Sequence, residues 1–229
     1  MKLWLYRHVA GTFVYGDRAK LLLIEKGIPQ DKLFAIHNSL DYDKQKTLRQ
    51  NIQPSKIFVE HFKNNLPTII FIGRLTKVKK LDMIVDALSI LRKENENFNL
   101  VFVGDGIERK RLEEKVITMH LQDCVWFYGA CYDEKINAEL IYNADLCVSP
   151  GNVGLTAMHA LMFGCPVITH DCFEWQMPEY EAVQPYITGN FFKQDDVNDL
   201  ANVIKHWFAN NSMRRAEVRV NSTSKCKIT

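Results

Sequence analysis

The sequence lacks the features that mark several large classes of protein. It has no run of about 18 apolar residues, the length that a membrane-spanning helix requires. Its first six residues, MKLWLY, are too short for the apolar core of a secretory signal peptide. The formal net charge of the 229 residues is only +2, which argues against a dedicated nucleic-acid-binding protein.

Two nucleotide-binding fingerprints are also missing. No GxGxxG follows the first strand of the main part of the chain, and no GxxxxGK[ST] is present. A diphosphate bound by this chain would therefore be held without either of those loops.

The cysteines carry little sign of special chemistry. The six of them form no CxxC pair, and four lie in or beside apolar runs typical of strands. Cysteines in such positions usually act as small buried apolar side chains, and they are typical of proteins in a reducing compartment. We therefore predict no metal site, and we expect a cytoplasmic protein.

The chain does contain a regular alternation of strand and helix patterns. Apolar runs without polar alternation, which predict strands buried on both faces, are TIIFIG (68–73), NLVFVG (99–104), VWFYG (125–129), DLCVSP (145–150) and PVIT (166–169). Helical patterns lie between them at 81–95, 108–119, 133–142 and 155–163. This order predicts an α/β fold with a Rossmann-like parallel sheet, helices on both faces, and ligands at the carboxyl ends of the strands.

Residues 145–171 form the unit around which the chain is organised. A short strand is broken at Pro150–Gly151–Asn152, and a helix then runs from Leu155 to Phe163 and stops at Gly164. Such a turn directs backbone N–H groups and a helix N-terminus at one point, where an anion would bind. Glycine turns between a strand and a helix also serve as plain chain reversals, so the turn alone leaves both interpretations open.

The ends of two other predicted strands add cations and glycines to the same edge of the sheet. The first strand runs into Gly73–Arg74–Leu75, with Lys77, Lys79 and Lys80 close behind, and the second runs into Gly104–Asp105–Gly106. Clusters of Lys and Arg are often only solvated surface, but Arg74 directly follows a buried strand. We therefore expect Arg74 to point at this edge.

The flanking segments are less regular. Strands at 9–15 and 33–37 enclose a helix at 19–26, which Asp17 is expected to cap. This βαβ unit is too small to bury a core alone, and it looks like part of a larger domain.

These patterns predict the organisation of the chain. The segments are a remnant of an N-terminal domain at 1–45, a linker with a short helix (55–62) at 46–66, the main domain at 67–211, and a basic tail at 212–229. The main domain should end in an edge strand within 187–192 and a helix that Asp195 and Asp196 cap. We expect the tail to be partly disordered.

Four segments, in order, resemble the group 1 glycosyltransferases, retaining enzymes built from two facing Rossmann-like domains (the GT-B fold). IHNSLD (36–41) resembles that family's PNGVD junction, and FIGRLTKVKKLDMIVDAL (71–88) its GRL…KG segment. LVFVGDGIERKRLE (100–113) resembles its GDG segment, and YNADLCVSPGNVGLTAMHALMFGCPVI (142–168) its aDvfvlPS…EgFGl…EAmA.G.PVI pattern. The resemblance covers roughly residues 9–210, with the main domain matching the C-terminal, donor-binding half of the fold.

The resemblance implies a donor site. Arg74 and Lys79 would contact the diphosphate of a nucleotide sugar and act as electrostatic catalysts, because cations and N–H groups stabilise charge that grows on the leaving oxygen. No metal and no other cofactor is then expected. The implied donor-binding residues are Gly73, Gly104, Asp105, Gly106, Gly151, Asn152, Val153, Gly154, Leu155, Thr156 and His159.

The resemblance also implies substrates. UDP is the favoured nucleotide, and the acceptor would be a glycan or lipid-linked molecule held mainly by an N-terminal domain. The implied process is the synthesis of cell-surface polysaccharide, with peripheral membrane association of the whole enzyme as a further expectation.

Two positions depart from the family pattern, which has Glu where this chain has Gly151 and His159. His159 either hydrogen-bonds a ribose hydroxyl or is satisfied by local partners, and both interpretations stay open. We hypothesise that Asn152 takes over part of the first Glu's task.

Three functions remain as alternatives at this point. The first is the donor-binding part of a glycosyltransferase, which alone should bind a nucleotide sugar weakly and transfer nothing, because the acceptor side of the cleft is not built. The second is a non-catalytic or truncated nucleotide-sugar-binding module that acts through a partner chain. The third is an epimerase or phosphorylase with the same two-domain fold, although no pyridoxal lysine can be located.

Overall fold

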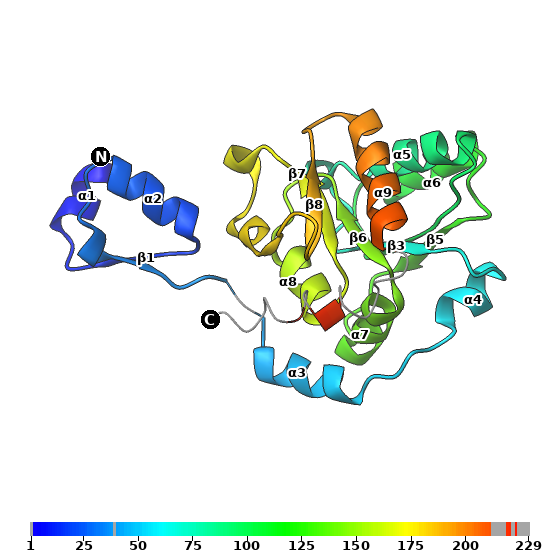
Figure 1. Ribbon diagram of the computed structural model, residues 1–229, viewed down its shortest axis with the longest axis horizontal. Helices are drawn as coiled ribbons and strands as arrows, with labels where there is room; N and C mark the ends of the chain where they lie inside the picture. Colours follow the sequence, from blue (N-terminus) through cyan, green and yellow to red (C-terminus); the bar gives the residue numbers. More distant parts are fainter. Residues whose placement is uncertain (1, 39, 212–218, 221–222, 224–229) are drawn as a thin grey trace.

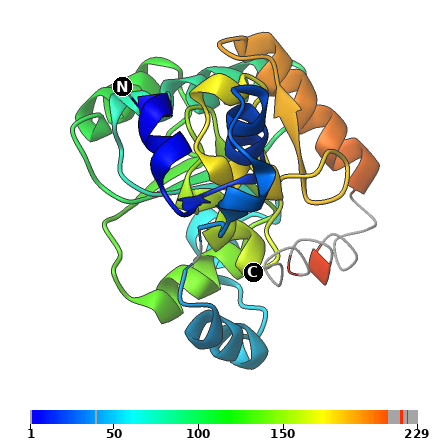
Figure 2. The ribbon, with the colours of Figure 1, turned by 90° about the vertical axis from the view of Figure 1, so that its left-hand side faces the viewer.

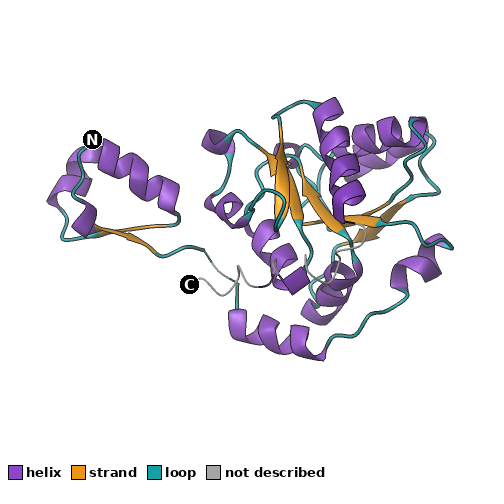
Figure 3. Ribbon diagram, in the orientation of Figure 1, coloured by secondary structure: helices purple, strands orange, loops and turns teal. Residues whose placement is uncertain are grey.

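The computed structural model describes residues 2–38, 40–211, 219–220 and 223. Its centre is a sheet whose strands are drawn in orange in Figure 3. The sheet has six strands, all parallel, in the order β5-β4-β3-β6-β7-β8. The strands are β3 (Thr68–Ile72), β4 (Asn99–Val103), β5 (Val125–Gly129), β6 (Leu146–Ser149), β7 (Val167–His170) and β8 (Gly189–Phe192). The predicted α/β fold is confirmed, and each strand lies within two residues of its expected bounds.

Helices cover both faces of this sheet, as predicted (Figure 1). One face carries α5 (Asp82–Lys93), α6 (Arg109–Thr118) and α9 (Val197–Asn211), and the other carries α4 (Ile57–Phe62), α7 (Glu134–Asn143) and α8 (Leu155–Met162). Successive residues of a strand point to opposite faces, so Ile69 and Phe71 join the first layer while Ile70 and Ile72 join the second. This double burial explains why the strand sequences show no polar alternation.

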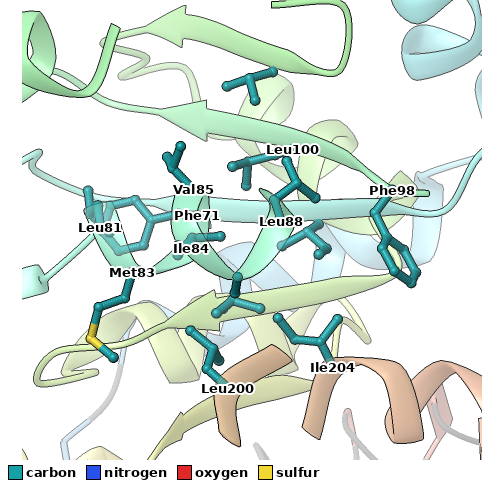
Figure 4. Packing of buried hydrophobic residues seen from close by; sticks show 14 of the residues in the cluster. Phe71, Leu81, Met83, Ile84, Val85, Leu88, Phe98, Leu100, Leu200 and Ile204 are labelled. Carbon is teal, nitrogen blue, oxygen red and sulfur yellow. The ribbon is translucent and has the colours of Figure 1, made fainter. Parts of the chain in front are cut away.

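The first layer is a dense apolar core (Figure 4). Phe71 and Leu100 from the sheet gather there with Ile84 and Leu88 of α5 and with Ile204 of α9. Each such side chain contributes about 1.5–3 kcal/mol when it is fully removed from water. This core holds the carboxyl ends of β3 and β4 in place.

The N-terminal segment forms a separate small unit, drawn in blue in Figures 1 and 2. It contains α1 (Lys2–His8), β1 (Thr12–Val14), α2 (Asp17–Glu25), the 3₁₀ helix η1 (Gln30–Lys32) and β2 (Leu33–Ala35), with β1 and β2 parallel. The expected βαβ unit is therefore confirmed. The prediction that Asp17 caps α2 is wrong, because the N-cap is Gly16 and Asp17 is the first helical residue.

A helix follows this unit where the sequence indicated only a connection. α3 (Tyr42–Asn51) is capped by the side chain of Asp41, which accepts from Lys44 N at 3.2 Å, and it packs on α7 and α8. The expected boundary between residues 45 and 46 falls inside it. The apolar pattern of α3 is weak because it rests on the larger unit along one narrow side.

The C-terminal part confirms β8 as an edge strand and corrects one cap. Asp196 caps α9 by accepting from Asp199 N at 3.0 Å. Asp195 does not cap the helix, because its backbone has a φ of 63° and its carboxylate pairs with Lys80. Most of the basic tail, and with it the expectation of disorder, lies outside the described residues.

Three of the five cysteines that the structure describes are buried, namely Cys124, Cys147 and Cys165. Burial raises the pKa of Cys147 to about 12, which keeps that thiol protonated and unreactive. Within the described part of the chain, no helix is both long enough and apolar enough to cross a membrane.

Candidate functional site

The strand order places the candidate site. The chain moves from β3 outward to β4 and β5, and then returns to the other side of β3 with β6, so the loops after β3 and β6 lead away in opposite directions. In a parallel α/β sheet, the crevice at such a reversal is where ligands bind. Gly73–Leu75 follow β3 at this point, and Pro150–Gly154 follow β6.

The turn after β6 ends in an uncapped helix. Gly154 is the N-cap of α8, with φ 55° and ψ −154°, and no side chain caps the helix. The first N–H groups of a helix have no intrahelical acceptor, so Leu155 and Thr156 present theirs at the edge of the sheet. This geometry and the helix dipole favour a negatively charged group.

Lys79 joins the loop after β3 to this turn. Its Nζ atom donates to Asn152 O at 2.6 Å and lies 3.5 Å from Val153 O, while its own carbonyl accepts from Gly151 N at 3.0 Å. Burial lowers the pKa of Lys79, and the charge of Glu179 opposes that shift. The structure thus brings Lys79 and the glycine turn together, as the sequence indicated.

The other cations are arranged differently. Arg74 is exposed, and no described residue forms a hydrogen bond or ion pair with its guanidinium group, which is therefore available to a ligand. Lys77 is exposed too, and Lys80 is paired with Asp195.

Close packing of backbone accounts for the glycines at this edge. A Cβ atom on Gly104 would overlap the carbonyl oxygen of Gly73 and lie 2.9 Å from its carbonyl carbon. A Cβ atom on Gly151 would overlap the Val78 carbonyl and lie 2.7 Å from Lys79 Cα. These glycines let the loops after β3, β4 and β6 touch one another. A glutamate therefore cannot occupy position 151 unless the backbone moves.

Several candidate residues already have partners within the protein. Asp105 accepts from Gly106 N at 2.7 Å and lies 3.7 Å from the guanidinium of Arg109. Thr156 Oγ1 donates to Ile72 O at 3.0 Å, which ties α8 to the end of β3. The Val153 side chain is fully buried. Toward a ligand, Thr156 could therefore act through its main-chain N–H or by accepting at its hydroxyl oxygen.

His159 faces a neighbouring helix. Its Nε2 atom lies 3.4 Å from Oε2 of Glu134, in the first turn of α7, and its ring lies 5.7 Å from that of Phe163. Burial lowers the pKa of His159, although the nearby Glu134 carboxylate works in the opposite direction. Sequence reasoning missed Glu134, because an acidic residue in the first turn of a helix is common for reasons of the helix dipole alone.

Sequence reasoning also missed two residues in the segment after β7, of which Gln176 supports the turn. Gln176 accepts from Val153 N at 2.9 Å and donates to Thr169 Oγ1 at 2.7 Å, so it fixes the turn against β7. Glu179, in the 3₁₀ helix η4 (Pro178–Ala182), is only 5% exposed and accepts from Asn38 Nδ2 at 2.7 Å. The Glu179/Glu181 pair was visible in the sequence, but nothing there linked it to the turn.

A cavity of substantial size lies elsewhere. It has a volume of about 750 Å³ and opens at the amino ends of β3, β6 and β7, beside Pro67, Asp145 and Pro166. None of its lining residues belongs to the glycine loops after β3, β4 and β6. The chemistry of the sheet edge at Lys79 therefore outweighs the size of this cavity.

A family model described as "Glycosyl transferases group 1" matches residues 53–222, most of the chain. The chain belongs to the group 1 glycosyltransferases. This match confirms the resemblance identified from the sequence motifs.

Individual relatives agree with this family. The chain is 24% identical over 216 residues to an uncharacterized 41.2 kDa protein of the cps region of Klebsiella pneumoniae, covering 87% of this chain and 56% of the relative. It is 26% identical over 171 residues to 2-deoxystreptamine glucosyltransferase of Streptomyces kanamyceticus, covering 73% and 44%. The chain thus spans about half the length of these relatives.

Two solved structures share the fold. Anabaena HepE in complex with UDP superposes with a TM-score of 0.75 at 20% identity, covering 97% of this chain and 60% of HepE. A glycosyltransferase from Rickettsia africae gives a TM-score of 0.77 at 20% identity, covering 98% and 61%. At these identities the superpositions establish the GT-B type of fold.

Proposed function

We propose that this chain is the donor-binding part of a retaining glycosyltransferase that uses a nucleotide diphosphate sugar. The observation that carries the proposal is the contact of Lys79 with the glycine turn beside the uncapped N-terminus of α8. Arg74, exposed at the end of β3, would supply a second cation.

The chemistry follows from these groups. When the bond between the anomeric carbon and the diphosphate breaks, negative charge grows on the leaving oxygen. The acceptor hydroxyl bonds to that carbon and gives its proton to the leaving phosphate. Arg74, Lys79 and the N–H groups of Leu155 and Thr156 would stabilise the leaving group more strongly as its charge grows. Removing one such donor costs about 2–4 kcal/mol of transition-state stabilisation in enzymes of comparable chemistry. The proposal needs no metal ion.

UDP is the favoured nucleotide, since Anabaena HepE has been solved in complex with UDP and in complex with UDP-glucose. Relatives named for amylovoran biosynthesis and for poly(glycerol-phosphate) glucosylation support an acceptor of glycan or polymer type and a role in cell-surface polysaccharide synthesis. We place the reaction in the cytoplasm, where nucleotide sugars and reduced thiols would both be available.

The replacement of two glutamates by Gly151 and His159 favours one alternative, a nucleotide-sugar-binding module without transfer activity. In that case the diphosphate would bind as proposed, but no acceptor would be glycosylated. His159 and Glu134 together could still hold a ribose hydroxyl, because the pair contains both a donor and an acceptor.

Calorimetric titration of the purified chain with UDP, GDP and ADP tests the proposal. We expect binding of at least one diphosphate, tightest for UDP. Arg74→Ala should weaken binding about tenfold or more, because a charge-assisted hydrogen bond contributes about 1.5–3 kcal/mol. Its guanidinium group pairs with no described residue, so the fold should not change.

Lys77→Ala is the matched control, since Lys77 is exposed in the same loop. It should leave the affinity within about twofold. Absence of heat with all three nucleotides, or equal effects of the Arg74 and Lys77 variants, would contradict the proposed site.

A further inference from the structure

Glu179 has an unusual environment for a carboxylate. It is 5% exposed, and within the described part of the chain no donor forms a hydrogen bond with its buried Oε2 atom. Only Oε1 is engaged, by Asn38 Nδ2 at 2.7 Å. Buried polar atoms nearly always have a hydrogen-bond partner, so an unpaired carboxylate oxygen calls for a ligand or water that donates to it.

Glu179 lies in a segment that also approaches the cation of the candidate site. Burial lowers the pKa of Lys79, and the charge of Glu179 works in the opposite direction. The segment that carries Glu179 also reaches the turn, because Met177 Cγ and Lys79 Nζ would each lie 3.8 Å from a Cβ atom on Gly154. An ammonium has three N–H donors, and Asn152 O and Val153 O are the acceptors described for it.

Position 151 cannot supply a carboxylate to the same region. The backbone of Val78 and Lys79 fills the space where its side chain would begin. Glu179 approaches the turn from η4, which packs against α8, and so brings a carboxylate to the site by another route.

We propose that Glu179 and Lys79 together hold one hydroxyl of the transferred sugar, with Oε2 of Glu179 accepting from the hydroxyl and Lys79 donating to its oxygen. A hydroxyl group can do both, whereas a phosphate oxygen only accepts and would be repelled by the carboxylate. The inference rests on the proposed function, since it assumes that Lys79 lies at the diphosphate. Asn38 belongs to the link with the N-terminal unit, and a sugar hydroxyl reaches the buried Oε2 atom only if the Asn38 contact opens.

The test compares UDP with a panel of UDP-sugars on the full chain. UDP contains the ribose and the diphosphate but no transferred sugar, so the ratio of the two affinities isolates the sugar contact. Glu179→Gln should lower the ratio of the affinity for the best UDP-sugar to the affinity for UDP about tenfold or more. Glu181→Gln is the matched control, because that carboxylate accepts from Asp17 N and Arg18 N instead.

Two further measurements keep the test decisive. Asn38→Ala removes the donor to Oε1 but leaves the carboxylate itself in place, so its effect on the ratio should be smaller than that of Glu179→Gln. Monodeoxy analogues of the best UDP-sugar, titrated against the unmodified chain, should reveal one hydroxyl whose loss abolishes the preference over UDP, even if the Glu179 variant does not fold.

Other outcomes separate the two proposals. If Glu179→Gln lowers the affinities for UDP and for the UDP-sugar equally, Glu179 does not contact the sugar. The same conclusion follows if the Asn38 and Glu179 variants change the affinity ratio equally. In both cases Glu179 would serve only to join the two units. Tight UDP binding with no preference for any UDP-sugar would overturn the sugar contact and retain the diphosphate site. Failure of UDP itself to bind would remove the proposed function.

Discussion

The two units of this chain bury their apolar residues to very different extents. In the sheet domain, Ile69, Ile70 and Phe71 of a single strand are all fully buried. In the N-terminal unit, the facing pair Phe13 and Phe34 are 71% and 50% exposed. The sheet domain therefore has its own core, whereas the N-terminal unit depends on contacts that its few elements cannot provide for one another.

The contacts between the units are accordingly polar. Glu181 accepts from the first two N–H groups of α2, at 2.8 Å from Asp17 N and 3.0 Å from Arg18 N. A Cβ atom on Gly16 would lie 2.6 Å from the same carboxylate, so glycine makes room for it. A carboxylate from one unit thus performs the capping task that a side chain of the other would normally perform.

The largest expected effect tests the difference in burial directly. Phe71→Ala should destabilise the protein by about 3–5 kcal/mol, because it leaves a cavity in the core of the sheet domain. Phe13→Ala, the same change at an exposed site, should alter stability by about 0.5 kcal/mol or less. Urea unfolding followed by circular dichroism measures both. Similar losses for the two variants would show that the N-terminal unit is packed in solution as tightly as the sheet domain.

A smaller effect is expected at the contact between the units. Glu181→Ala should lower the free energy of local opening of α2 by about 1–2 kcal/mol, because two helix N–H groups lose their acceptor. Hydrogen exchange at the amides of Asp17 and Arg18 should accelerate, with no change in the amides of β3. Glu174→Ala, at an exposed site of the same segment, should leave both rates unchanged.

The smallest effect concerns the pH dependence of the sheet domain. Burial holds the pKa of His159 below its ordinary value of 6.5, so the unfolded chain takes up a proton at this site before the folded chain does. Stability from this site is therefore complete above about pH 6.5 and falls as the pH decreases below it. The urea concentration at the unfolding midpoint should therefore fall as the pH decreases from about 7 to 5. His159→Gln should make that fall smaller. An unchanged slope would assign the decline to His61 and His170, whose pKa values are also lowered.

The sheet domain could be predicted well from the sequence because its signals are local. A strand buried on both faces, such as Thr68–Ile72, is a continuous apolar run, and the helix after it has a wide apolar side. α3 was missed for the opposite reason, since it is polar and rests on α7 and α8 along a narrow contact.

The candidate site also has a part that could be predicted from the sequence and a part that could not. The glycine turn and the cations after β3 could be assigned to one edge from strand order alone, and Lys79 does contact the turn. The partners Gln176, Glu179 and Glu134 could not be assigned, because they reach the site through contacts between distant segments. The cap predicted at Asp195 was wrong because its sequence position suits a cap, while its backbone conformation and Lys80 give it another role.

The tight fit around Gly151 also constrains how this protein can evolve. Any replacement of that glycine adds a Cβ atom, which collides with the main chain of residues 78–79. A single substitution therefore cannot introduce the glutamate that the family pattern has at this position. A length change or a shift in the segment after β3 would have to come first. Selection on the proposed donor site must therefore act through other positions around this turn.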